Sequence, residues 1–134
     1  MALGYEAATL RDAMMDAITT RAGASALLRI YDSTRPATGA AITTETLLAE
    51  LTCNATFADP AVDGVLTLNA IADDTDADDT GTAEWFRIVQ SDGTTFVLDG
   101  DVGTSGSDLN LDSVSVVAGG TVSVTSFFIT EGNA

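Results

Sequence analysis

The sequence predicts a mainly β protein, an antiparallel β-sandwich or jelly roll, with one α-helix at its N-terminus. Three observations favour this fold class. Only residues 5–21 show apolar residues at helical spacing. From residue 26 onward, apolar and polar residues alternate in about seven or eight short segments, each expected to be a strand. Turn residues separate these segments. The 134 residues contain no repeat or linker, so we expect a single domain, 1–134, with the sandwich over 26–130.

The helix over residues 5–21 is expected to be amphipathic, since apolar residues recur at i, i+4, i+7 and i+8. Its apolar stripe consists of Leu10, Met14, Ala17 and Ile18. Met15 lies about 100° from that stripe, and Gly23 is a stop signal. For Met14 and Met15, core packing is favoured and contact with a partner stays open, because methionine fits irregular surfaces. The stripe itself could pack on the sheet of the same chain or reach a neighbouring subunit.

Three strands are expected in the first half of the β region. Residues 26–31 (ALLRIY) form the first, and a turn at Pro36 follows it. Residues 46–52 (TLLAELT) are ambiguous between helix and strand, but their short length and flanking threonines favour a strand. Residues 65–70 (VLTLNA) come after two turn signals, Asp-Pro and Asp-Gly, and read as the third strand.

The second half begins with the longest candidate for a central strand, residues 82–90, which carries apolar side chains on both faces. Residues 91–94 (SDGT) predict a hairpin into residues 95–98. Two short alternating segments follow, and residues 121–130 form the last strand. The short segments are marked by Leu109, Leu111, Val114 and Val116. In the last strand, residues 127–129 (FFI) break the alternation, which indicates a bulge or a second face that meets another element or subunit.

Six apolar residues are therefore candidates for contact with a partner. They are Met14, Met15, Trp85, Val89, Phe127 and Ile129. Trp85 is interpreted as a core residue or an interface anchor, and Arg87 is positioned to lie across its ring.

The composition excludes several classes of function. The formal net charge is −15, with 20 acidic residues, 5 arginines and no lysine or histidine. Such a surface repels nucleic acid and anionic membranes, and no segment approaches the roughly 20 apolar residues of a membrane span. The absence of histidine and lysine removes the common general base, the Schiff-base nucleophile and histidine-based metal sites. We expect no enzyme activity and no cofactor; a carboxylate pair is the one catalytic set left, and twenty acids make that signal unspecific.

Three further motifs have weak functional readings. Asp74, Asp76 and Asp78 alternate like the first ligands of an EF-hand, but the required glycine and bidentate glutamate are missing. We interpret residues 73–79 as a solvated loop and leave a weak Ca²⁺ site open. The glycines of GDVGTSG match no phosphate-binding pattern and read as turn residues. The lone Cys53 is interpreted as a buried hydrophobe, with an inter-subunit disulfide as the alternative.

A resemblance to a known family extends over nearly the whole chain. It is carried, in order, by RDAMMDAITT, LLRIYDSTRPATG, LLAELT, DPAVDGVLTLNAI, TGTAEWFRIVQSDGTTFVLDGDVGTSGSDLNLDS and TVSVTSFFITEGNA, most specifically by residues 29–39, 81–89 and 103–111. The chain resembles a family of small acidic structural proteins of tailed bacteriophages. The resemblance implies a capsid decoration (cement) protein, and it transfers no catalytic residues. It also implies the major capsid protein as a partner and self-assembly into homotrimers.

We therefore expect a virion protein at the capsid exterior, synthesised in the host cytoplasm, because the N-terminus lacks the pattern of a signal peptide. The alternatives are a tail, baseplate or fibre component, a host-surface or glycan-binding module, and, as the weakest, a carboxylate-dependent hydrolase. The number of copies of the protein in each virus particle distinguishes a capsid protein from a tail protein. A glycan array tests the glycan-binding alternative, and a panel of glycosides tests the hydrolase.

Overall fold

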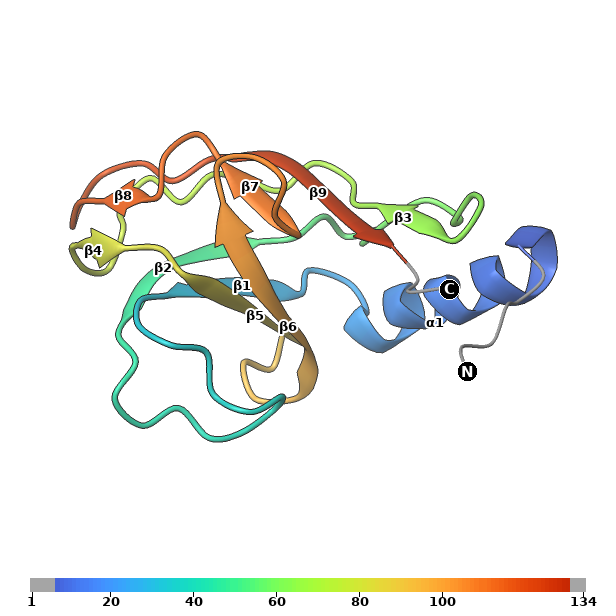
Figure 1. The fold of residues 1–134 in the computed structure, drawn as a ribbon, viewed down its shortest axis with the longest axis horizontal. Helices are drawn as coiled ribbons and strands as arrows, with labels where there is room; N and C mark the ends of the chain where they lie inside the picture. Colours follow the sequence, from blue (N-terminus) through green and yellow to red (C-terminus); the bar gives the residue numbers. More distant parts are fainter. Residues whose placement is uncertain (1–6, 131–134) are drawn as a thin grey trace.

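The computed structural model describes residues 7–130, and Figure 1 shows a helical N-terminus beside a body of strands. One π-helical turn, η1 (Ala7–Arg11), runs into α1 (Asp12–Ala22). The expected helix start at residues 5 and 6 lies outside the described residues. The strands are β1 (Leu27–Tyr31), β2 (Leu47–Thr52), β3 (Val65–Thr67), β4 (Gly81–Thr82), β5 (Trp85–Val89), β6 (Phe96–Gly103), β7 (Leu109–Leu111), β8 (Ser115–Val116) and β9 (Val124–Thr130).

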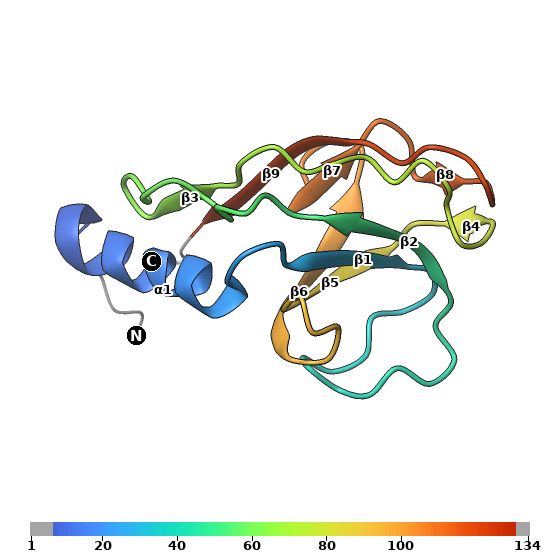
Figure 2. The same ribbon diagram turned by 180° about the vertical axis from the view of Figure 1, so that it is seen from behind.

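Seven strands form one open mixed sheet in the order β2-β1-β5-β6-β7-β9-β3, and β4 and β8 form a small second sheet. The mainly β class with one N-terminal helix is confirmed. The finer expectation, a purely antiparallel sandwich or jelly roll, differs from this sheet, because β6 and β7 pair in parallel. In Figures 1 and 2, β6 crosses between two layers, β2-β1-β5 and β7-β9-β3. The core lies between these layers.

The parallel pairing depends on a tight loop that the sequence pattern did not reveal. Parallel strands usually need a crossover of about a dozen residues, yet only residues 104–108 separate β6 from β7. Asn110 stabilises this loop, since its side chain accepts a hydrogen bond from Ser107 N and donates to Ser107 O, both at 3.1 Å. It also donates to Ser126 Oγ on β9. One amide side chain therefore connects the loop to the next strand.

Strand β5 is the centre of the sheet and is buried along its whole length. It pairs with β1 on one side and with β6 on the other. One face carries Trp85, which stacks on Tyr31 at 4.6 Å between ring centroids. The other face carries Phe86, which meets Phe127 of β9 edge to face at 5.0 Å and so links the two layers. The apolar side chains that the sequence places on both faces of this strand are therefore buried on both faces.

The aspartate-rich segment, expected as a solvated loop over residues 73–79, is largely exposed, but residues 72–79 are also bonded to the sheet. Its backbone bonds to the outer edge of β2, through Ala72 N to Thr52 O and Asp78 N to Leu48 O. Its Ala77 is buried and exchanges backbone bonds with residues 119–120 in the other layer. We call this segment the acidic strap. It covers an edge strand that would otherwise offer unpaired backbone groups.

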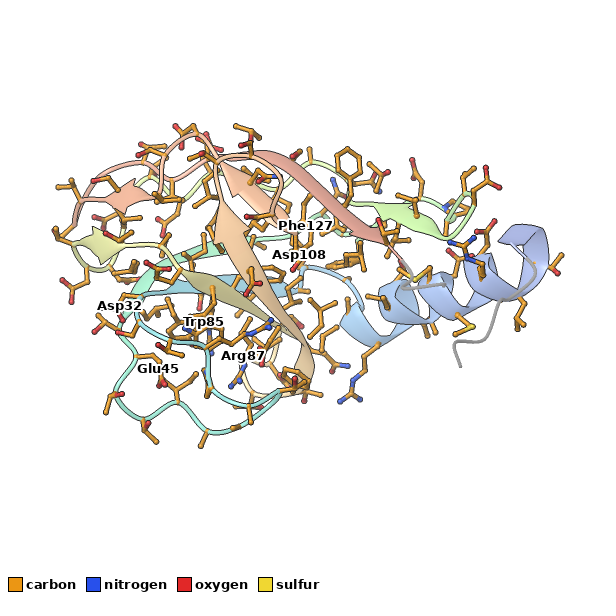
Figure 3. All side chains as sticks on the ribbon, viewed as in Figure 1. Asp32, Glu45, Trp85, Arg87, Asp108 and Phe127 are labelled. Carbon is orange, nitrogen blue, oxygen red and sulfur yellow. The ribbon has the colours of Figure 1, made fainter. Side chains whose placement is uncertain are left out.

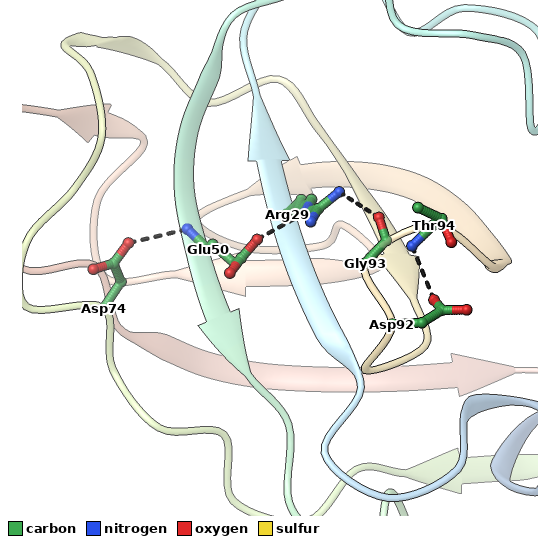
Figure 4. Close-up of polar contacts among 6 residues, drawn as sticks. All are labelled: Arg29, Glu50, Asp74, Asp92, Gly93 and Thr94. Carbon is green, nitrogen blue, oxygen red and sulfur yellow. Dashed lines mark hydrogen bonds and ion pairs between the residues drawn. The ribbon is translucent and has the colours of Figure 1, made fainter.

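Side-chain bonds extend the strap into the sheet, as Figure 4 shows. The carboxylate of Asp74 accepts a hydrogen bond from Glu50 N at 3.0 Å. The Glu50 side chain in turn pairs with Arg29 at 2.8 Å, and Arg29 donates to Gly93 O in the β5–β6 hairpin. Three acidic or basic side chains thus connect the strap, β2, β1 and the hairpin.

Candidate functional site

The helix α1 is attached to the rest of the chain by polar groups at its start. The carboxylate of Asp12 accepts a hydrogen bond from Gly64 N at 2.7 Å, and that of Asp16 accepts one from Ala61 N at 2.8 Å. These acids are one helical turn apart, so they share a face of the helix. That face therefore points to the loop before β3.

The end of the helix is attached to the β5–β6 hairpin. The Arg21 guanidinium donates twice to Phe96 O, at 3.1 and 2.9 Å. Gln90 Nε2 donates to Arg21 O at 2.6 Å, and this bond satisfies a carbonyl at the helix end. Polar bonds at both ends thus determine which way the helix is rotated.

This rotation leaves most of the predicted apolar stripe at the surface, although Ile18 is half-buried against the core. Leu10 is 48% exposed and Met14 is 42% exposed, whereas Met15 and Ala22 are buried against the fold. Of the two alternatives left open for the stripe, packing on the sheet of the same chain does not hold for Leu10 and Met14, whereas Ile18 packs against the core. Core packing, which the sequence favours for both methionines, is wrong for Met14. Of the two methionines, Met15 packs in the core and Met14 remains at the surface. Such an outward-facing apolar stripe is typical of a contact surface.

The stripe continues into a cavity of about 270 Å³ between α1, β6 and β9. We call it the α1–β9 groove. Its lining residues are Ile18, Phe86, Leu98, Asp99, Gly100, Asp108, Phe127, Phe128, Ile129 and Thr130. Phe128 is 50% exposed and Phe127, beside it in sequence, is buried. In Figure 3, Phe127 and Asp108 lie in this region, apart from the labelled group around Trp85.

The broken alternation in the last strand has a simple structural cause. Burial still alternates along β9, with Phe127 inward, Phe128 outward and Ile129 half-buried. Pairing with β3 is regular here, Leu66 with Ile129 and Thr67 with Phe128, so this triplet forms no bulge against β3. Phe128 is an apolar residue on the outer face, which agrees with a second face that meets another element or subunit.

The six candidate contact residues separate into two groups. Met15, Trp85, Val89 and Phe127 are buried in this chain and offer no more than a few per cent of their surface. Met14 is exposed, and Ile129 lines the α1–β9 groove. The structure adds Phe128 and Leu98 to the site. Phe128 could have been found from the unbroken FFI triplet, whereas Leu98 carried no distinguishing signal.

A buried ion pair occupies the opposite face of β5. Arg87 binds both carboxylate oxygens of Asp99, at 2.7 and 3.0 Å, and donates to Ala40 O at 2.8 Å. Its guanidinium also lies 5.4 Å from the Trp85 ring centre and 5.3 Å from that of Phe96. The predicted contact of Arg87 with Trp85 is confirmed. Hydrogen bonding to Asp99 raises the pKa of Arg87.

These bonds hold the long loop of residues 32–46 against the sheet. Asp99 accepts a further bond from Gly39 N at 3.0 Å. Trp85 Nε1 donates to Asp32 O at 3.1 Å, and the Asp32 carboxylate accepts from Thr46 N at 2.6 Å. The polar groups of this region form hydrogen bonds that attach the loop to the sheet. We therefore assign the ion pair a structural role.

A second, wider hollow of about 630 Å³ lies beside that loop. It is lined by Asp32, Ser33, Thr34, Arg35, Thr82, Glu84, Trp85 and Asp101. Arg35 lies 3.8 Å from Asp101, a long and exposed ion pair that contributes little to stability. Trp85 is the one aromatic residue in this lining, and because it is 1% exposed, the hollow offers almost no aromatic surface.

Two remaining sequence candidates have clear environments. Cys53 is buried, and burial raises the pKa of its thiol to about 12, so the thiolate is not populated at neutral pH. Its interpretation as a buried hydrophobe is confirmed. In the acidic strap, burial and the charges of Asp74, Glu50 and Asp76 raise the pKa of Asp78. Among residues 7–130, no group of three or more acidic, histidine or cysteine side chains is arranged to hold a metal ion.

Comparison with known proteins identified no relative. No family model matches the chain, and neither does any curated protein or solved structure. Within the described part of the chain, no helix has the length and hydropathy to cross a bilayer.

Proposed function

We propose that this protein is a structural component of a tailed-bacteriophage virion, and specifically a capsid decoration protein that binds the outer capsid surface and stabilises the shell. One observation carries the proposal: polar bonds fix α1 so that Met14 and the α1–β9 groove face outward. An adhesive protein needs such a surface on a rigid body, and it needs no reactive group.

The rest of the molecule supports this function. Buried polar groups are almost completely bonded, with Thr19 Oγ1 the one unsatisfied side-chain atom among the described residues. Such satisfaction favours a single rigid conformation. The net charge of −15 keeps the outer surface from binding packaged or released DNA. On a symmetric shell, many weak contacts act together through avidity. A small groove in each copy would therefore be enough for tight binding to the capsid.

The proposal is tested on purified particles of the phage that encodes the chain. Quantitative mass spectrometry should find it at a copy number comparable with that of the major capsid protein. Particles made without it should lose their DNA at a lower temperature or a milder osmotic shock. Particles of unchanged stability would contradict the stabilising role.

The same experiment separates the alternative that the protein belongs to the tail, baseplate or fibre, since a tail component is present in far fewer copies. A glycan-binding role has less support, because Trp85 and Tyr31 stack on each other inside the chain. Assembly into homotrimers stays a prediction, and sedimentation velocity of the purified protein tests it.

A further inference from the structure

We propose that the α1–β9 groove receives an apolar side chain from a basic segment of a partner protein. This inference rests on the proposed function, because it specifies the chemistry of the capsid surface that the protein would bind.

The size and lining of the groove favour a side chain over a small-molecule ligand. Small-molecule sites usually measure roughly 300–1,000 Å³, and the groove has about 270 Å³. Its floor and walls are the apolar side chains of Ile18, Phe86, Leu98, Phe127 and Ile129, and Phe128 lies at its edge. A space of this kind suits one large apolar anchor, which is how a few residues come to dominate an interface.

The charge around the groove selects between a second copy and a basic partner. Asp108 lines the groove, and its carboxylate accepts a backbone hydrogen bond from Asp101 N at 3.1 Å. Asp99, the other acid of the lining, is already paired with Arg87. A second copy carries the same formal net charge of −15, and the repulsion would oppose its docking at this groove, so the predicted homotrimer would use another surface. A lysine or arginine beside the anchor would be attracted to Asp108 and to the acidic surface in general.

The neighbouring surface extends the contact. Phe128 is 50% exposed on the outer face of β9, at the edge of the groove, and Met14 lies one helical turn before Ile18 on α1. Aromatic and methionine side chains are enriched in interfaces because they cover large areas and adapt to their partner.

The test is titration of the isotope-labelled full chain with three synthetic peptides of equal length, followed by heteronuclear NMR. One peptide alternates leucine and lysine, the second leucine and glutamate, and the third serine and lysine. We expect the leucine–lysine peptide to shift the signals of Ile18, Phe128 and Ile129, and to bind at least about tenfold more tightly than either other peptide. Equal binding of the serine–lysine peptide, or equal binding of the leucine–glutamate peptide, would overturn the proposal.

Two variants locate the binding. Phe128→Ser removes an exposed ring from the outer face of β9, beside the groove. The matched control Val117→Ser removes an apolar side chain that is 61% exposed just after β8, and Figure 1 shows β8 at the far end of the molecule from α1. We expect Phe128→Ser to weaken binding of the leucine–lysine peptide about tenfold and Val117→Ser to leave it unchanged. Equal effects of the two variants would overturn the proposal.

Two further results separate this inference from the proposed function. Self-association that rises with salt and is lost in Phe128→Ser would assign the groove to a second copy and overturn the inference, while particle binding could still hold. Specific peptide binding by a chain that is absent from purified particles would support the groove and refute the function.

Discussion

The two faces of β5 differ in the kind of side chain that they bury: one face holds a paired charge, and the other holds apolar side chains beside a groove. On one face, Arg87 is buried but meets Asp99, Ala40 O and two aromatic rings, so a charge is placed inside the protein with its donors bonded. On the other face, Phe86 leads to the α1–β9 groove, where Phe128 remains in contact with water. The comparison teaches that the polar groups of β5 are satisfied within this chain, whereas apolar surface stays exposed beside its other face.

The largest effect is expected from breaking the ion pair. Arg87→Met leaves the carboxylate of Asp99, whose side chain is 1% exposed, without its cation. Loss of one member of a buried pair typically costs about 3–5 kcal/mol, and we expect a loss of this size in the free energy of unfolding. Urea denaturation measures it. The control Arg35→Met removes an exposed pair and should cost under about 1 kcal/mol; similar losses in both variants would show that the Arg87 face is not special.

A smaller effect is expected at the floor of the groove. A methyl group on Gly100 would lie 2.5 Å from the ring of Phe86, which is buried and cannot move freely. Overpacking of this kind costs about 1–3 kcal/mol, so Gly100→Ala should lower the thermal midpoint. The double variant Gly100→Ala with Phe86→Leu provides space for the methyl group. It should therefore be less destabilised than the sum of the two single variants, and strict additivity would contradict the close contact.

The acidic strap contrasts with the Arg87–Asp99 pair, because its carboxylates lie close to one another and, among the described residues, not to a cation. The pKa of Asp78 lies above 3.8 in the folded state, so ionisation of Asp78 costs stability at every pH above that raised value. Asp78→Asn should stabilise the protein at neutral pH, by under about 1 kcal/mol since the side chain is exposed. The gain should vanish well below pH 3.8, where the aspartate is protonated in both states.

Thermal unfolding over a pH series measures this effect. Asp63→Asn removes the same charge from the turn before β3, at the sheet edge opposite to the one that the strap covers, and is the control. An equal gain in both variants would show that net charge alone, rather than the local cluster, is responsible.

The smallest effect on stability is expected from Phe128→Ser. Its ring is half in water already, so its removal should change the thermal midpoint by no more than Val117→Ser does. A large loss would mean that Phe128 contributes to the fold, and the contrast between the two faces of β5 would fail.

Local patterns in the sequence predicted most of the strands. Residues 46–52 became β2 and residues 26–31 became β1, each without its first residue, because alternation and turn residues act over short distances. The interpretation of the GDVGTSG glycines as turn residues is wrong for Gly100 and Gly103, which lie in β6. The parallel pairing of β6 with β7 and the packing of the strap depend on Asn110, Asp74 and backbone bonds between distant segments. No local pattern encodes those bonds.

The helix shows the same limit for the site. The spacing of Met14 and Ile18, one turn apart within α1, placed them on one face of the helix, whereas Leu10 precedes α1 in the π-helical turn η1. Which face is buried was decided by the bonds of Asp12 and Asp16 to a loop some fifty residues away, at Gly64 and Ala61. The periodicity of a helix identifies a stripe, whereas its surroundings decide whether that stripe meets the core or a partner.

The most direct test of the central claim is binding to phage particles that were made without this protein. Wild type, Phe128→Ser and Val117→Ser compete for such particles, and the bound fraction of each is measured by mass spectrometry after sedimentation. The account predicts that wild type and Val117→Ser bind equally well and that Phe128→Ser is largely lost from the particles. Equal retention of all three chains, or no binding by wild type, would contradict it.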